Sequence, residues 1–327
     1  MKAWQIQQLG EPAEAIALAD VPVPEPADAE VRIAVDATAI SLPDVFMCRG
    51  TYAFRPELPF IPGQEVSGVV VAAGKDAKTP VGERVMAVTS FFRGHGGLAE
   101  QALALDIATH LAPKEMDHAE AACFSISYQT AYIGLVTRGE IKPEENLVVL
   151  GAAGGTGTAA IQLGCALGAR VIAVAAGEEK AALCRELGAD TVIDHTQVGI
   201  TEGIKEATHG QGADLVYDPV GGDFCKAASL AMASGGRILI IGYASGSYYD
   251  PPTAHLIMNN TSMVGVYVGA YSKPYTSEVS EALVSLWREK KIRSVVTTRV
   301  SFEDVPSALE DIANRRAMGK IVVCDEP

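Results

Sequence analysis

The second half of the chain alternates between two patterns of apolar residues. Short continuous apolar runs, which are typical of buried strands, are separated by stretches with helical spacing. We expect strands at NLVVLGA, RVIAVAA, TVID, ADLVYDPV, RILIIGY and SMVGVYVG, and helices near 157–167, 178–187, 202–208 and 223–233. This alternation indicates an α/β fold with a parallel sheet covered by helices on both faces.

The first 122 residues follow a different pattern. Short β-like runs such as EVRIAVDATAI, QEVSGVVVAAG and ERVMAVTS are broken by Pro and Gly, which predicts a small, mostly antiparallel β-domain. From 269 onward, helical spacing at 277–290 and 304–315 precedes a terminal strand, KIVVCD. The pattern leaves open whether this last part forms a third domain or returns to the first one.

Charge and cysteine content narrow the class of function. The 327-residue chain carries a net charge of −14, which disfavours binding to nucleic acid or anionic membranes but allows a small-molecule substrate. No apolar run approaches the length needed to span a membrane. The six cysteines form no C-x-x-C pair, and the segment MKAWQIQQLGEP lacks the apolar core of a signal peptide, so a reducing cytoplasm is the expected compartment.

A glycine loop follows the first predicted strand of the α/β part, in the sequence LVVLGAAGGTG at 147–157. Glycines at such a loop allow a tight turn, close approach of a pyrophosphate and close packing of helix on strand. The helix N-terminus then offers free N–H groups to the phosphates. The loop predicts a dinucleotide site at Gly154, Gly155, Thr156 and Gly157.

The end of the second strand bears on which dinucleotide binds. NAD sites usually carry an acidic residue there, whereas RVIAVAAGEEK ends in Ala175, and Lys180 follows one helical turn later. Glu178 and Glu179 complicate this interpretation, because either carboxylate could reach the ribose. The pattern favours NADP(H) over NAD(H).

With these motifs, the chain resembles the zinc-independent members of the medium-chain dehydrogenase/reductase superfamily, in their NADPH:quinone oxidoreductase branch. The resemblance extends over GTY, LPFIPGQEVSGVV, VGERV, GGLAEQ, QTAY, GAAGGTG, ELGADTVID, DPVGG and GKIVV. It implies a GroES-like domain from 1–123 and 269–327, and a doubly wound Rossmann domain from 124–268. It also implies a homodimer formed through the last Rossmann strand, near SMVGVYVG.

The same resemblance bears on metal content. Zinc-dependent relatives bind their catalytic metal with a Cys, a His and a second Cys, and these positions fall here at Ser41, Gln64 and 126–127, where no Cys or His stands. Zinc prefers thiolate, imidazole or carboxylate, and only Glu65 remains nearby. We therefore expect no metal.

The resemblance also assigns roles to single residues. It implies Tyr52 as proton donor, with Ser41 and Asp44 beside it, although Tyr52 could be a turn aromatic and Asp44 a helix cap. It implies further cofactor contacts, although His195 could also be a plain surface residue. These contacts are Thr130, His195, Gly242, Tyr243, Val266, Val268 and Lys320.

We therefore expect an NADPH-dependent reductase of quinones or α,β-unsaturated carbonyl compounds. One alternative is an enoyl-CoA reductase, which would need a basic cluster for the CoA phosphates. The candidates for that cluster are Arg49, Arg55, Arg93 and Lys273. The other is a non-catalytic NADPH-binding protein of the crystallin type.

Overall fold

The computed structural model describes residues 1–324, and the chain divides into two compact units. Unit 1 contains Met1–Ile126, Ser272–Val284 and the described residues from Ser294 onward. Unit 2 contains Ser127–Tyr271 and Ser285–Arg293. Asp325, the last residue of the predicted terminal strand, lies outside the described residues.

Unit 1 is built on a six-stranded sheet in the order β13-β14-β3-β4-β5-β6, with β3 also paired to β6. Its strands are β3 (Glu30–Ile40), β4 (Glu65–Ala73), β5 (Arg84–Thr89), β6 (Gln101–Leu111), β13 (Val296–Val300) and β14 (Lys320–Cys324). Pairing among β3 to β6 is antiparallel, as the sequence predicts. The C-terminal β14 pairs antiparallel with β3, so the end of the chain returns to this sheet.

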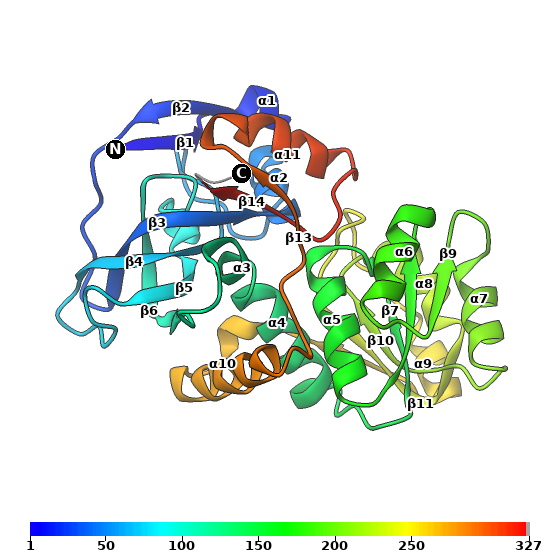
Figure 1. Ribbon diagram of the computed structural model, residues 1–327. Coiled ribbons are helices and arrows are strands. Elements are labelled where there is room, and N and C mark those ends of the chain that lie inside the picture. The colour runs from blue at the N-terminus through cyan, green and yellow to red at the C-terminus, as the bar shows by residue number, and fades with distance from the viewer. Residues whose placement is uncertain (325–327) are drawn as a thin grey trace. The chain divides into compact units, whose positions relative to one another are not determined.

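Helices and a small hairpin surround the sheet of unit 1. The hairpin pairs β1 (Lys2–Ile6) with β2 (Ile16–Asp20). The helices are α1 (Pro12–Ala15), α2 (Leu42–Arg49), η1 (Phe91–Arg93), α3 (His118–Ala122), η4 (Phe302–Asp304) and α11 (Val305–Ala313). In Figure 1, α11 lies beside α1 and α2, and all three contribute to one apolar core.

Unit 2 is a six-stranded parallel sheet in the order β12-β11-β10-β7-β8-β9. Its strands are β7 (Asn146–Val149), β8 (Arg170–Ala175), β9 (Thr191–Asp194), β10 (Ala213–Asp218), β11 (Met232–Ile240) and β12 (Ser262–Gly265). Its helices are α5 (Gly155–Ala166), α6 (Glu178–Glu186), α7 (Ile200–Ala207), α8 (Gly222–Ser229), α9 (Thr253–Asn259) and η3 (Val268–Ala270). The fold class expected from the alternating pattern is confirmed, and Figure 1 shows β-strands and helices alternating along this unit.

Two helices contain a boundary between the units. These are α4 (Ser125–Tyr132), which continues into a π-helical turn, η2 (Ile133–Arg138), and α10 (Lys273–Arg288). The predicted helix at 277–290 begins four residues early, at Lys273, because Pro274 suits the first turn of a helix. Along residues 1–324, no helix is long and apolar enough to cross a membrane.

One predicted helix is shorter than expected. The pattern suggested a helix over 223–233, but α8 ends at Ser229 and β11 begins at Met232. Met232 pairs with Ala213 of β10, so the sheet captures these residues. The left-handed Gly235 that follows, with φ of +80°, is also unsuited to a helix.

Candidate active site

The start of α2 brings together two predicted catalytic residues of unit 1. The Asp44 carboxylate accepts the Ser41 N–H at 2.8 Å and the Ser41 hydroxyl at 3.2 Å. Its other oxygen accepts the Gly63 N–H at 2.9 Å. Asp44 is fully buried, and burial raises the pKa of its carboxyl group despite these hydrogen bonds. Asp44 therefore caps the helix and also holds the segment that leads to Gln64.

A buried ion pair lies at the end of β4. Lys320 on β14 donates to one Glu65 oxygen at 2.7 Å, and the other oxygen accepts the Ile126 N–H at 2.6 Å. The side chains of Glu65 and Lys320 are 2% and 9% exposed. Burial alone would lower the pKa of Lys320, but the Glu65 carboxylate outweighs it and the pKa is raised. The positive charge of Lys320 therefore faces Glu65, and its predicted contact with a cofactor stays a prediction.

The position at which zinc relatives carry a histidine holds a buried amide. Gln64 is 5% exposed, and its amide nitrogen lies 4.0 Å from the Met47 sulfur. Neither an amide beside a thioether nor the Ser41 hydroxyl is a ligand that zinc prefers. Among residues 1–324, no group of three or more His, Cys, Asp or Glu side chains is arranged to hold a metal ion. The donor set at these positions does not fit zinc.

Tyr52 belongs to a loop that follows α2. Its N–H donates to the Phe46 carbonyl at 3.2 Å, and its half-buried ring packs against Phe54 and Phe91. The structure thus gives Tyr52 the packing of a turn aromatic. Its predicted role as proton donor stays a prediction.

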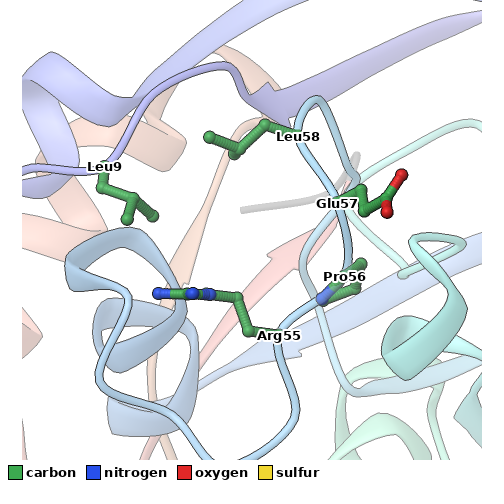
Figure 2. Close-up of a pocket in the computed structure, with 5 residues that line it drawn as sticks. All are labelled: Leu9, Arg55, Pro56, Glu57 and Leu58. Carbon is green, nitrogen blue, oxygen red and sulfur yellow. The ribbon is translucent and has the colours of Figure 1, made fainter.

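A pocket of about 310 Å³ lies on this loop, lined by Leu9, Arg55, Pro56, Glu57 and Leu58. In Figure 2, the Leu9, Arg55 and Leu58 side chains extend into the same space, whereas Glu57 points away from it. The Arg55 guanidinium donates to the Gly50 carbonyl at 3.2 Å. It has no carboxylate partner within the described part of the chain.

In unit 2, the glycine loop joins β7 to α5. The Gly154 N–H donates to the Gly151 carbonyl at 3.0 Å, which closes a tight turn. The left-handed residue of this turn is Gly151, with φ of +58°, a position that the motif analysis missed. A Cβ on Gly157 would lie 2.4 Å from the Gly151 carbonyl oxygen, so the helix approaches the loop as closely as glycine permits. The first turn of α5, with Gly155 and Thr156, fits a pyrophosphate that binds through N–H groups.

The end of β8 differs in one respect from the expectation. No acidic residue follows Ala175 on its own strand, but Asp194 of β9 pairs directly with Ala175. The Asp194 carboxylate accepts the Thr196 hydroxyl at 2.7 Å, the Thr196 N–H at 3.0 Å and the Gly177 N–H at 3.2 Å. These hydrogen bonds lower its pKa. Asp194 was missed because its relation to Ala175 depends on strand pairing, and its carboxylate is engaged in holding the loop.

Residues around this loop have defined partners. The His195 N–H donates to the Ala175 carbonyl at 3.1 Å, and its ring meets Phe224 edge-on with centroids 4.9 Å apart. The Glu178 carboxylate forms an ion pair with Arg185 of the same helix, α6, at 2.7 Å. Lys180 is half-exposed on α6. Of the two carboxylates that complicated the choice of dinucleotide, Glu178 is therefore engaged elsewhere.

The remaining predicted cofactor residues lie in three places in unit 2. Gly242 and Tyr243 follow β11, and the Tyr243 ring packs on Tyr248 with centroids 4.8 Å apart. The half-buried Val266 and Val268 follow β12. Thr130 lies on α4 and is 9% exposed.

The predicted residues that follow β7, β8, β9, β11 and β12 share the carboxyl edge of one parallel sheet. Doubly wound sheets bind their ligands at this edge.

Comparisons with known proteins give one family match in the N-terminal part of the chain and one in the C-terminal part. Residues 27–113 match the family described as alcohol dehydrogenase GroES-like domain, and residues 155–312 match the family described as zinc-binding dehydrogenase. The quinone oxidoreductase-like protein 2 homolog of Nematostella vectensis is 35% identical over 90% of this chain and 81% of that protein. Human quinone oxidoreductase is 29% identical over 99% of this chain and 97% of its own length.

The chain belongs to the quinone oxidoreductase family of medium-chain dehydrogenases/reductases. Solved structures of this family have the same fold. Escherichia coli quinone oxidoreductase complexed with NADPH superposes with a TM-score of 0.91 at 25% identity, covering 99% of this chain and 100% of that one. A Pseudomonas syringae quinone oxidoreductase superposes at 0.90 and 25% identity, covering 99% of each chain. The resemblance inferred from the motifs is confirmed.

Proposed function

We propose that this quinone oxidoreductase family member is an NADPH-dependent reductase of quinones or α,β-unsaturated carbonyl compounds that works without a metal ion. Two observations carry the proposal: a glycine loop of the dinucleotide-binding type between β7 and α5, and, separately, a donor set that does not fit zinc. Oxidation of a simple alcohol needs a Lewis acid or a strong base to remove the hydroxyl proton. Reduction of a quinone or an activated double bond has no such requirement.

The carboxyl edge of the unit 2 sheet supports the cofactor assignment. Gly157 lies too close to Gly151 to carry a side chain, and the first turn of α5 begins directly after the loop, where its N–H groups could bind phosphates. Solved relatives of the family were obtained in complex with NADPH. Bound NADPH would supply one hydride to the acceptor.

The remaining chemistry falls to groups of unit 1. A quinone gains two electrons and two protons, so one proton must come from the protein or from water in addition to the hydride. We assign this proton to the Tyr52 hydroxyl. The backbone of Tyr52 is held by the hydrogen bond from its N–H to the Phe46 carbonyl. Asp44 positions Ser41, whose hydroxyl would exchange its hydrogen bond to the Asp44 carboxylate for one to the acceptor oxygen as negative charge builds there.

The charges of unit 1 weigh against a CoA thioester as substrate. Arg49 pairs with Glu11 at 2.7 Å, Arg93 with the buried Glu30 at 2.9 Å, and Lys273 with Asp106 at 3.5 Å. Of the four basic residues considered for CoA phosphates, only Arg55 lacks an acidic partner among the described residues. A single exposed arginine is a weak site for the several phosphate charges of CoA.

We further propose that the chain acts in the cytoplasm as a homodimer joined through β12. This strand is at the edge of its sheet, where unpaired N–H and C=O groups can extend the sheet into a second copy. Three large apolar side chains near it are strongly exposed: Ile257, Met258 and Tyr267, at 70%, 79% and 61%. Such an apolar surface beside an open strand suits burial against an identical chain.

The test is NADPH oxidation at neutral pH with a chelator present, comparing 1,2-naphthoquinone with crotonyl-CoA. We expect the quinone to be turned over in preference to the thioester, and NADPH to be preferred to NADH. Preferred turnover of crotonyl-CoA would make the chain an enoyl-CoA reductase. Tight NADPH binding without turnover of either acceptor, by wild type and Tyr52→Phe alike, would indicate a non-catalytic binding protein.

A further inference from the structure

The pocket of about 310 Å³ on the loop after α2 combines one cation with an apolar wall. Leu9, Pro56 and Leu58 supply the apolar part, and the two leucines are 44% and 42% exposed. In Figure 2, both leucine side chains and the Arg55 guanidinium extend into the same space, whereas Glu57 points away from it. Covering these leucines with an aliphatic group would remove apolar surface from water, which is favourable.

The Arg55 guanidinium is available for a ligand. Of its five N–H donors, one is used within the described part of the chain, in the hydrogen bond to the Gly50 carbonyl at 3.2 Å. Among residues 1–324, no carboxylate lies within ion-pair distance of it. The planar fork of an arginine matches the two oxygens of a carboxylate, which it binds through two parallel hydrogen bonds.

The acidic residues that are nearest along the chain do not neutralise this charge. Glu57 points out of the pocket in Figure 2. Glu11 is bound by Arg49, whose Nε and Nη2 donate to its carboxylate at 2.9 and 2.7 Å. The pocket therefore presents a positive charge although the whole chain carries a net charge of −14, and a local charge of this kind selects an anion.

We propose that this pocket binds an organic monocarboxylate with an aliphatic chain, of the size of a medium-chain fatty acid. The carboxylate would accept two N–H groups of Arg55, and the chain would cover Leu9 and Leu58. A volume of about 310 Å³ is at the lower end of the range for small-molecule sites, which suits one short chain. The five described residues that line the pocket include none that we assign to hydride or proton transfer, so this site goes beyond the proposed function.

The experiment measures binding of octanoate to the full chain by isothermal titration calorimetry at low salt. Octanamide has the same chain with a neutral end, and acetate has the same charge with almost no chain. Methyl NMR spectra of protein labelled at leucine show whether the signals of Leu9 and Leu58 shift. Neither NADPH nor an acceptor is present, so the result is independent of the proposed function.

We expect octanoate to bind at least about tenfold more tightly than octanamide or acetate, because each of these lacks one of the two interactions. Its affinity should fall as NaCl is added, because salt screens the charge of the exposed Arg55. The methyl signals of Leu9 and Leu58 should shift in proportion to the fraction of protein bound.

Two substitutions test the role of the cation. Arg55→Gln should weaken octanoate binding at least about tenfold and remove the preference over octanamide. Arg55→Lys should keep that preference, because the positive charge remains. The matched control is Arg138→Gln, since Arg138 is also exposed and donates to a backbone carbonyl, that of Gly265 at 3.1 Å. It should bind octanoate as wild type does, and melting temperatures show that each variant has folded.

The proposal is overturned if wild type fails to bind octanoate, or binds octanoate and octanamide equally. It is also overturned if folded Arg55→Gln keeps the wild-type affinity, because Arg55 would then serve only to hold its loop at Gly50. Octanoate binding that shifts leucine signals other than those of Leu9 and Leu58 would contradict it as well, since the ligand would occupy a different site.

Discussion

At the scale of single residues, the Glu65–Lys320 pair connects segments 255 residues apart in the chain. Sequence motifs placed Glu65 beside Gln64 and Lys320 in a terminal strand, but no spacing rule predicts that the two side chains meet. Their contact follows from the pairing of β14 with β3 and of β3 with β4. The chemistry of each residue type could therefore be read from the sequence, whereas its partner required the fold.

Glu65→Gln is expected to lower the free energy of unfolding by about 3 kcal/mol, because it leaves the Lys320 ammonium buried without its counter-charge. The double variant with Lys320→Met should recover part of this loss, since no buried charge remains. Chemical denaturation followed by circular dichroism measures both effects. The control is Glu289→Gln, which breaks an exposed pair with Lys291 and should cost less than about 1 kcal/mol. Equal losses in Glu65→Gln and Glu289→Gln would contradict the assigned role of the buried pair.

At the same scale, the buried His110 on β6 makes the free energy of unfolding depend on pH. Burial, with help from the charge of Lys273 and opposed by Asp106, lowers the pKa of His110 from 6.5 to about 4. The unfolded chain then binds a proton more readily than the folded one. The stabilisation is complete above pH 6.5 and is lost as the pH falls towards 4, by about 3 kcal/mol in total.

His110→Gln should therefore flatten the fall in unfolding free energy between pH 6.5 and 4 relative to wild type. Denaturation curves at several pH values provide the measurement. His209→Asn serves as control because His209 is exposed, and asparagine tolerates its φ of +51°. If His110→Gln and wild type lose stability in parallel, burial of His110 is not the cause of the acid sensitivity.

At the scale of elements, periodicity predicted the strand and helix order of unit 2 well, because parallel strands buried on both faces leave a strong apolar signal. It failed where backbone conformation or pairing decides the outcome. Gly151 and Gly154 are indistinguishable in sequence, yet only Gly151 is left-handed. Likewise, the end of α8 depends on Met232 pairing with Ala213.

Gly157→Ala is expected to weaken NADPH binding at least tenfold, because its methyl group would meet the Gly151 carbonyl oxygen at 2.4 Å and displace α5 from the loop. Gly154→Ala should have a smaller effect, since its Cβ would meet a single neighbouring atom at 3.2 Å and its φ is −83°. Fluorescence titration with NADPH measures both affinities. Full affinity in Gly157→Ala would show that close approach of the helix is not needed for the site.

At the scale of the whole molecule, composition and motif order predicted the class of protein. Which residues belong to which unit depends on how the strands pair. Helical spacing after residue 269 did not distinguish a third domain from a return to the first. The antiparallel pairing of β14 with β3 brings the end of the chain into the unit 1 sheet. The proposed dimer also belongs to this scale, because it would form through β12, which the strand order leaves at an edge of the unit 2 sheet.

Met258→Asp combined with Ile257→Asp should shift the proposed dimer towards monomer, because two carboxylates would be buried without partners in the interface. Light scattering after size-exclusion chromatography measures the mass in solution. As control, Val198→Asp changes another exposed apolar residue, 44% accessible, which follows β9 at the opposite edge of the sheet. A monomeric wild type, or a dimer unaffected by the double change, would contradict a dimer through β12.

The central claim is that this chain transfers hydride from NADPH without a metal ion, and one measurement tests it most directly. The purified protein is dialysed against a strong chelator, its metal content is determined, and its NADPH-dependent reduction of 1,2-naphthoquinone is compared before and after treatment. We predict full turnover with less than about one-tenth of a metal ion per chain, because the residues at the relatives' zinc positions include no zinc-binding side chain. Loss of turnover that added Zn²⁺ restores would contradict the claim.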